Sequence, residues 1–156
     1  MRLSDQDAAF LYAETASAPM HGATFSVVEG RLSASEVQSH IAGRIHLIPR
    51  LRKRLAFVPL NLANPVWVDD PKFALEDHVV AHRVQRGTTV EQAVAEGVEQ
   101  LQWVLPRNKP LWRMIVIEGV RNRTILVQAA HHAMADGASG VDMSLVLFDL
   151  KASAVP

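Results

Sequence analysis

The sequence predicts an α+β fold in which helices pack on a mixed β-sheet. Two apolar runs of strand length follow each other closely, at residues 111–117 and 124–130. Two other segments carry apolar residues at helical spacing, and each begins with the signature of a capping box. With 156 residues, 49% of them apolar and 21% charged, the chain has the length and composition of one globular domain.

The expected strands are short and rich in β-branched residues. The strand near the N-terminus alternates enough to be half-buried, whereas the run at 111–117 is nearly continuous and suits a buried strand. Residues 120–123 then turn the chain, so that the last two strands are expected to be neighbours. In chain order, the five strands are expected at residues 23–28, 65–68, 78–84, 111–117 and 124–130.

The expected helices begin and end at recognisable residues. The first starts at the capping box Ser33-Ala-Ser-Glu36 and continues to Pro49. The second starts at Thr88-Thr-Val-Glu91, and its apolar stripe ends at Pro106. A third helix is expected over roughly 137–148, followed by a tail or linker at 151–156.

Charge and composition narrow the possible partners and compartments. Sixteen basic and sixteen acidic side chains balance to zero, so nothing in the charge favours nucleic acid as a partner. The absence of cysteine excludes a thiolate nucleophile and a cysteine metal site, and it fits a reducing, cytoplasmic location. No apolar run approaches the roughly 18 residues that span a bilayer, so contact with a membrane or lipid droplet would be peripheral.

The most specific motif is His131-His132-Ala133-Met134-Ala135-Asp136-Gly137, which follows the last expected strand. From the composition of this chain, two adjacent histidines at that spacing from Asp-Gly arise by chance in roughly one sequence in a thousand. Successive residues of a strand face opposite sides of the sheet. His131 is in phase with Val127 and His132 with Gln128, so we expect one ring to pack on the scaffold and the other to face a cleft.

The same alternation argues against a metal site, because the two rings point apart and no further ligand set is visible. Imidazole suits proton transfer near neutral pH, which makes general base catalysis the sharper hypothesis. Asp136 is open to two structural readings, as the N-cap of the following helix or as one partner of an ion pair that fixes the loop. Gly137 would then supply a permissive backbone or a close approach.

The motif resembles the HHxxxDG signature of the CoA-dependent acyltransferase superfamily. More narrowly, the chain is similar to the bacterial wax ester synthase/diacylglycerol acyltransferase family. The landmarks that match that family, in order along nearly the whole chain, are Leu3-Ser4, Asp7, Phe10-Leu11, Pro19-Met20-His21, the segment 49–55, Pro65-Val-Trp67 with Asp70, Pro110-Leu-Trp112 and Glu118-Gly119.

The resemblance implies roles for several residues. His132 would be the general base that accepts the proton of a fatty alcohol or diacylglycerol hydroxyl, as that oxygen attacks the thioester of a long-chain acyl-CoA. His131, Asp136 and Gly137 would belong with His132 to the catalytic motif, and Asp136 would hold the loop through an arginine, for which Arg52 is the first candidate and Arg54 the second. Acyl-CoA would be a co-substrate, and neither a bound cofactor nor a metal is implied.

The resemblance also implies an architecture. Complete members of the family have two similar halves, as in chloramphenicol acetyltransferase-like enzymes, and this chain corresponds to the first half. Residues 1–150 are then an N-terminal acyltransferase domain, which we expect to be weakly active or inactive without its second half. Two alternatives remain: a non-catalytic interaction or lipid-binding half-domain that self-associates or pairs with another chain, and another HHxxxDG enzyme such as a peptide-forming condensation domain.

Overall fold

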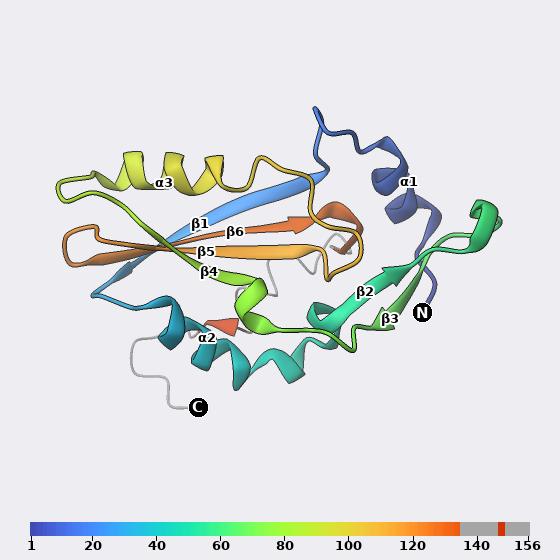
Figure 1. The fold of residues 1–156 in the computed structure, drawn as a ribbon, viewed down its shortest axis with the longest axis horizontal. Helices are drawn as coiled ribbons and strands as arrows, with labels where there is room; N and C mark the ends of the chain where they lie inside the picture. The colour runs from blue at the N-terminus through green and yellow to red at the C-terminus, as the bar shows by residue number, and fades with distance from the viewer. Residues whose placement is uncertain (135–146, 149–156) are drawn as a thin grey trace.

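The computed structural model describes residues 1–134 and 147–148 (Figure 1). Short 3₁₀ helices occur in several connections, and two of them matter below, η2 at Pro49–Arg52 and η5 at His132–Met134. The α-helices and strands in chain order are α1 (Asp5–Ala13), β1 (His21–Glu29), α2 (Ala34–Ala42), β2 (Lys53–Ala56), β3 (Val66–Asp69), β4 (Val79–Arg83), α3 (Val90–Glu99), β5 (Trp112–Glu118) and β6 (Arg123–His131).

The main sheet has four strands in the order β1-β6-β5-β4. β6 pairs antiparallel with β1 and with β5, whereas β4 and β5 are parallel and are connected through α3. The sheet is therefore mixed, and the predicted α+β class is confirmed. A separate two-stranded antiparallel sheet, formed by β2 and β3, lies at one end of the molecule (Figure 1).

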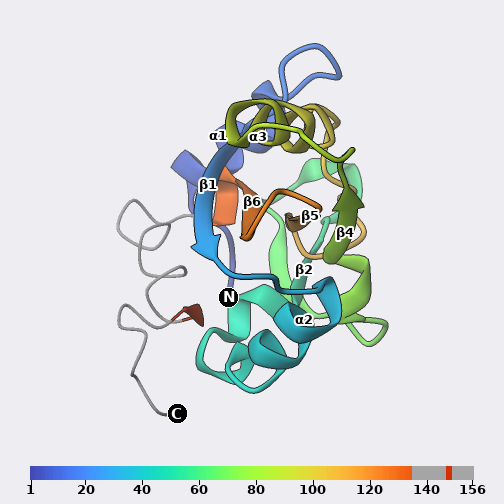
Figure 2. The same cartoon turned by 90° about the vertical axis from the view of Figure 1, so that its left-hand side faces the viewer.

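Helices cover both faces of the main sheet. Figure 2, which looks along the strands, shows α3 above the sheet and α2 below it. Under α3 the helix backbone comes very close to the strands, since a Cβ at Gly97 would lie 2.6 Å from Ile117 Cδ1 and 2.7 Å from Val127 Cγ2. On the α2 face, Val37 and Ile41 belong to a second, larger apolar cluster. Each strand of the sheet centre is thus buried on both sides.

The structure corrects several boundaries of the predicted helices. The first helix ends at Ala42 rather than before Pro49, and the chain continues in 3₁₀ turns that still bury Ile45. The second ends at Glu99 instead of near Pro106. Its capping box consists of Thr89 and Gln92, one residue later than predicted, whereas the box at Ser33 and Glu36 is confirmed.

Two elements were not predicted, α1 and β2. Leu3, Ala8 and Leu11 are buried, but the apolar residues of α1 show little helical periodicity. β2 falls in the basic segment 49–55, which lacks the pattern of a strand. The predicted third helix, except for residues 147–148, and the predicted tail lie outside the described residues.

Candidate active site

The two histidines lie where β6 ends. His131 is the last residue of the strand, and its N–H donates to Leu111 O over 2.9 Å. His132 begins the short helix η5, and its N–H donates to Met20 O over 2.9 Å. Backbone hydrogen bonds to two other segments therefore position both residues.

The His131 side chain is fully buried and electrically neutral. Its Nδ1 accepts a hydrogen bond from the Ala133 N–H over 3.0 Å, so the single ring proton resides on Nε2. Burial lowers the pKa of His131 to about 4, the nearby Glu14 carboxylate opposes this shift, and the Arg107 charge reinforces it. At neutral pH this imidazole is thus a structural member of the site.

Glu14 lies opposite His131 and has a side chain that is only 1% exposed. Its Oε1 accepts the Met20 N–H over 3.0 Å and lies 3.4 Å from His131 Nε2, a contact without good hydrogen-bond alignment. Its Oε2 pairs with the guanidinium of Arg107 at 3.2 Å, and Arg107 also donates to Leu11 O. A buried carboxylate thus connects the end of α1, the segment before β1 and the histidine strand.

His132 faces the opposite way and is exposed. Its ring packs against Phe10 of α1 with 5.1 Å between centroids, and a Cβ at Gly22 would lie 3.8 Å from its Cε1. The predicted alternation of the two rings is confirmed: one is buried on the scaffold and the other is accessible. An accessible imidazole beside a rigid support can accept a proton from a hydroxyl group placed against it.

The residues expected to organise the loop are only partly described. Asp136 and Gly137 lie outside the described residues. Arg52 is exposed on η2, and its pairing with Asp136 stays a prediction. Arg54 is 3.9 Å from Asp70 Oδ1, in the small sheet.

Arg50, which was not a candidate, reaches the histidine loop. Its Nη1 donates to Met134 O over 3.4 Å, and its guanidinium lies over the Trp67 ring at 5.6 Å from the centroid. Neither Arg50 nor the buried Glu14 carried a signal in the sequence. Arg50 lies one residue before the Leu-Arg-x-Arg pattern, and Glu14 follows a short helix that the pattern did not predict.

Comparison with known proteins places the chain in a family. The family model "Wax ester synthase/diacylglycerol acyltransferase catalytic domain" matches residues 3–156. A Mycobacterium tuberculosis (strain H37Rv) protein whose name assigns it as a diacylglycerol O-acyltransferase is 33% identical over 156 residues, which cover 96% of this chain and 33% of that protein. Another from the same strain is 30% identical over 152 residues, 95% of this chain and 56% of that relative.

Solved structures show the same fold. The wax ester synthase/diacylglycerol acyltransferase of Marinobacter aquaeolei VT8 superposes with a TM-score of 0.74 at 22% identity, over 92% of this chain and 37% of that one. The starter condensation domain of rhizomide synthetase, solved in complex with C8-CoA, has a TM-score of 0.71 at 16% identity, over 93% of this chain and 33% of that one. The chain spans about a third of the length of the first curated relatives, and it belongs to the wax ester synthase/diacylglycerol acyltransferase family.

Proposed function

We propose that this chain contributes the catalytic base of an acyl-CoA-dependent O-acyltransferase that makes triacylglycerols or wax esters. The observation that carries the proposal is the exposed imidazole of His132, next to the buried, neutral His131. Support comes from the family and from the names of its mycobacterial relatives. Among structures with this fold, one is a complex with an acyl-CoA.

In the proposed reaction, His132 accepts the proton of an alcohol or diacylglycerol hydroxyl. The hydroxyl oxygen attacks the thioester carbonyl of acyl-CoA and forms a tetrahedral intermediate. Collapse of this intermediate breaks the carbon–sulfur bond, and the imidazolium returns the proton to the departing CoA thiolate. The products are an ester and free CoA, no acyl-enzyme is formed, and base catalysis of this kind is worth about 10²–10⁴-fold in rate.

Glu14 and Arg107 would support this chemistry without touching substrate. The ion pair of the buried Glu14 with Arg107 supports the His131 side of β6, which helps to hold the backbone that carries His132. A neutral His131 also places no positive charge beside the base that must become an imidazolium. The supports are thus arranged to keep one ring rigid and uncharged and the other accessible.

The decisive experiment measures ester formation from a long-chain acyl-CoA with diacylglycerol or hexadecanol, with the missing portion of a relative supplied in trans. His132→Ala is compared with His46→Ala, a matched control that removes an exposed histidine elsewhere. We expect a loss of about 10²–10⁴-fold in the first variant and none in the second. Activity that survives His132→Ala would reject the assigned base.

Two further arms address the length of the chain and the acyl donor. Because this chain covers about a third of its relatives, we expect little activity from the 156 residues alone and much more when the missing portion of a relative is supplied in trans. Carrier-protein thioesters, which a condensation domain would use, serve as alternative donors. Turnover of these but not of CoA thioesters would favour the condensation-type alternative.

A non-catalytic interaction module remains the second candidate, and an exposed apolar strand favours it. Phe25 is 55% exposed and Val27 42% exposed on β1, which is an edge strand of the main sheet. Such a surface suits a protein or lipid partner. Light scattering that shows a monomer, together with no binding of acyl chains, would count against this candidate.

Within the described part of the chain, no helix is both long and apolar enough to cross a bilayer.

A further inference from the structure

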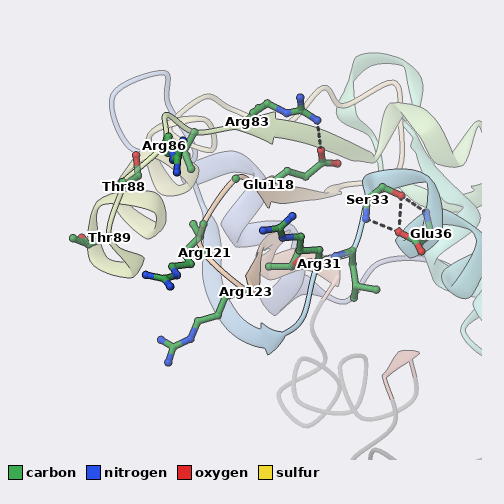
Figure 3. Close-up of a pocket in the computed structure, with 16 residues that line it drawn as sticks. Arg31, Ser33, Glu36, Arg83, Arg86, Thr88, Thr89, Glu118, Arg121 and Arg123 are labelled. Carbon is green, nitrogen blue, oxygen red and sulfur yellow. Dashed lines mark hydrogen bonds and ion pairs between the residues drawn. The ribbon is translucent and has the colours of Figure 1, made fainter.

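A wide cavity opens at the end of the main sheet that is opposite to the histidines. Its volume is about 1150 Å³, and its walls come from the loop after β1, the loop between β4 and α3, and the turn between β5 and β6. Figure 3 shows Arg83 and Arg86 on one side of the cavity and Arg31, Arg121 and Arg123 on the other. None of the described residues that line it is a lysine or an aromatic residue.

The cavity carries an excess of positive charge. Five arginines and two glutamates line it, which is a formal excess of three positive charges in a chain whose net charge is zero. Both glutamates already have partners. Glu36 accepts hydrogen bonds from the Ser33 N–H at 2.8 Å and hydroxyl at 2.9 Å, and these lower its pKa. Glu118 accepts the Ala34 N–H at 2.9 Å and pairs with Arg83 at 3.2 Å.

The other four arginines have no such partner. Arg31, Arg86, Arg121 and Arg123 are exposed, and within residues 1–134 and 147–148 none of them forms a hydrogen bond or ion pair through its side chain. Like charges that gather on one surface repel one another, and solvent and salt only partly screen that repulsion. A bound anion would relieve it.

The loops that carry these arginines are held together by their backbones. Val84 N–H donates to Glu118 O over 2.9 Å, and Gly30 N–H donates to Asn122 O over 2.9 Å. Gly119 has a φ of +105°, and a Cβ there would lie 2.8 Å from Val84 O, so the approach of the two loops requires glycine. The arginines therefore project from a connected frame instead of from three independent loops.

Two helices add to the positive potential. α2 and α3 both begin at the cavity, where their N-caps Ser33 and Thr89 form part of the wall. The N-terminal end of a helix carries a partial positive charge. Capping boxes already satisfy backbone N–H groups at the N-termini of both helices. The helices therefore add positive electrostatic potential to the cavity, and the arginine side chains supply the hydrogen-bond donors.

The cavity is separate from the candidate active site. Arg123 begins β6 and His131 ends it, so the two are about 27 Å apart at the usual rise per strand residue. A ligand in the cavity would not touch the reacting groups of the proposed acyl transfer. The function of the cavity is accordingly independent of that proposal.

We propose that this arginine cavity binds a ligand through a phosphate group, or through two linked phosphates. The planar guanidinium group of arginine matches phosphate oxygens in a bidentate geometry, and every cationic side chain among the described lining residues is an arginine. Without an aromatic side chain to stack on a base, the site would recognise the phosphate part of its ligand. A lipid headgroup and a soluble phosphorylated metabolite share this chemistry.

Calorimetric titration of the 156-residue chain with inorganic pyrophosphate, at low and at high salt, tests the proposal. We expect saturable binding that weakens as salt rises. In Arg121→Gln/Arg123→Gln we expect a loss of affinity of about tenfold or more for each arginine removed. The matched control Arg2→Gln/Lys72→Gln removes two exposed charges outside the cavity and should leave affinity within about twofold.

A charge-preserving variant distinguishes bidentate hydrogen bonding to phosphate from a general electrostatic attraction. Arg121→Lys/Arg123→Lys keeps the charge but loses the planar guanidinium group, so we expect it to bind distinctly more weakly than the wild type. Circular dichroism spectra establish that each variant is folded. An affinity equal to that of the wild type in the Gln variant, or an equal loss in the control, would overturn the proposal.

A second experiment decides whether the phosphate belongs to a lipid headgroup or to a soluble ligand. Co-sedimentation with phosphatidylglycerol vesicles is compared with neutral phosphatidylcholine vesicles, with and without pyrophosphate as competitor. Arginine-dependent binding to the anionic vesicles identifies a lipid headgroup, whereas binding of pyrophosphate alone identifies a soluble ligand. If neither probe binds in an arginine-dependent manner, the proposal is wrong.

Discussion

The two ends of β6 place charged groups in opposite situations. At the C-terminal end, Arg107 and His131 both contact Glu14, and the Glu14 and His131 side chains are almost completely removed from water. At the N-terminal end, Arg121 and Arg123 are exposed and form no ion pair with an acid among the described residues, although Glu29 is the register partner of Arg123. The buried groups at the C-terminal end lose their hydration, which costs free energy, but their contacts fix the positions of the side chains. The exposed arginines at the N-terminal end cost the fold little, and their guanidinium N–H groups stay available to a ligand. Stability should therefore be sensitive at one end and insensitive at the other.

The largest loss of stability is expected from Glu14→Ala. Removal of the carboxylate leaves the Met20 N–H without its acceptor and the Arg107 guanidinium with Leu11 O alone. Breaking a fully buried pair costs about 3–5 kcal/mol of unfolding free energy, and we expect about 3 kcal/mol here because the Arg107 side chain is 35% exposed. Glu14→Gln keeps the shape and one acceptor oxygen, so it should lose less. Urea denaturation measures both. A loss below about 0.5 kcal/mol in Glu14→Ala would show that the end of β6 is not held by this pair.

A pH-dependent loss of the same order is expected from His131. Its pKa is about 4 in the folded chain and near 6.5 when unfolded, so the unfolded state binds more protons between these values. The resulting stability is fully present above pH 6.5 and falls by on the order of 3 kcal/mol as the pH drops through 4. Burial also lowers the pKa of His78, which adds to the loss in the same direction.

Unfolding midpoints at pH 7, 5.5 and 4.5 measure this dependence. His131→Gln retains an acceptor for the Ala133 N–H and should have a shallower pH slope than the wild type. Arg121→Gln, at the other end of the strand, should keep the wild-type slope because arginine does not titrate in this range. Identical slopes in all three proteins would contradict the assignment of a buried, neutral His131.

The smallest effect is expected from Arg121→Gln/Arg123→Gln. Both side chains are exposed and lack partners in the part of the chain that the structure describes, so their removal should change stability by less than about 0.5 kcal/mol. Thermal unfolding checks this at low salt, where any relief of repulsion would appear as a slight gain. A loss of several kcal/mol would make these arginines structural and would remove the contrast between the two ends.

Residue patterns were sufficient for the parts of the fold that follow local rules. β5 and β6 are apolar runs of strand length, and the capping box at Ser33 satisfies its own backbone groups, so both were predictable. The opposite facing of His131 and His132 follows from strand alternation alone. Nothing further about the environment of the two rings followed from their positions in the chain.

The missed features depend on contacts between distant segments. Glu14 appears as a surface acid in the sequence, and its burial is made tolerable by the Met20 N–H and by Arg107, which is 93 positions away. Leu101 and Leu105 extend the apolar stripe of α3 beyond its true end, because they are buried after the chain has left the helix. Arg50 meets Met134 through a tertiary contact that no local spacing encodes.

The pairing of β1 with β6 also has a consequence for the order in which the chain folds. His21 and His131 are register partners although 110 positions separate them, so this ladder closes a very long loop. Contacts of such high sequence separation slow folding, since chain entropy is lost before the hydrogen bonds are gained. A nascent chain can pair its edge strand only after β6 has been synthesised, and this pairing brings Gly22 and the imidazole of His132 to the same end of the sheet, where Phe10 packs on that ring.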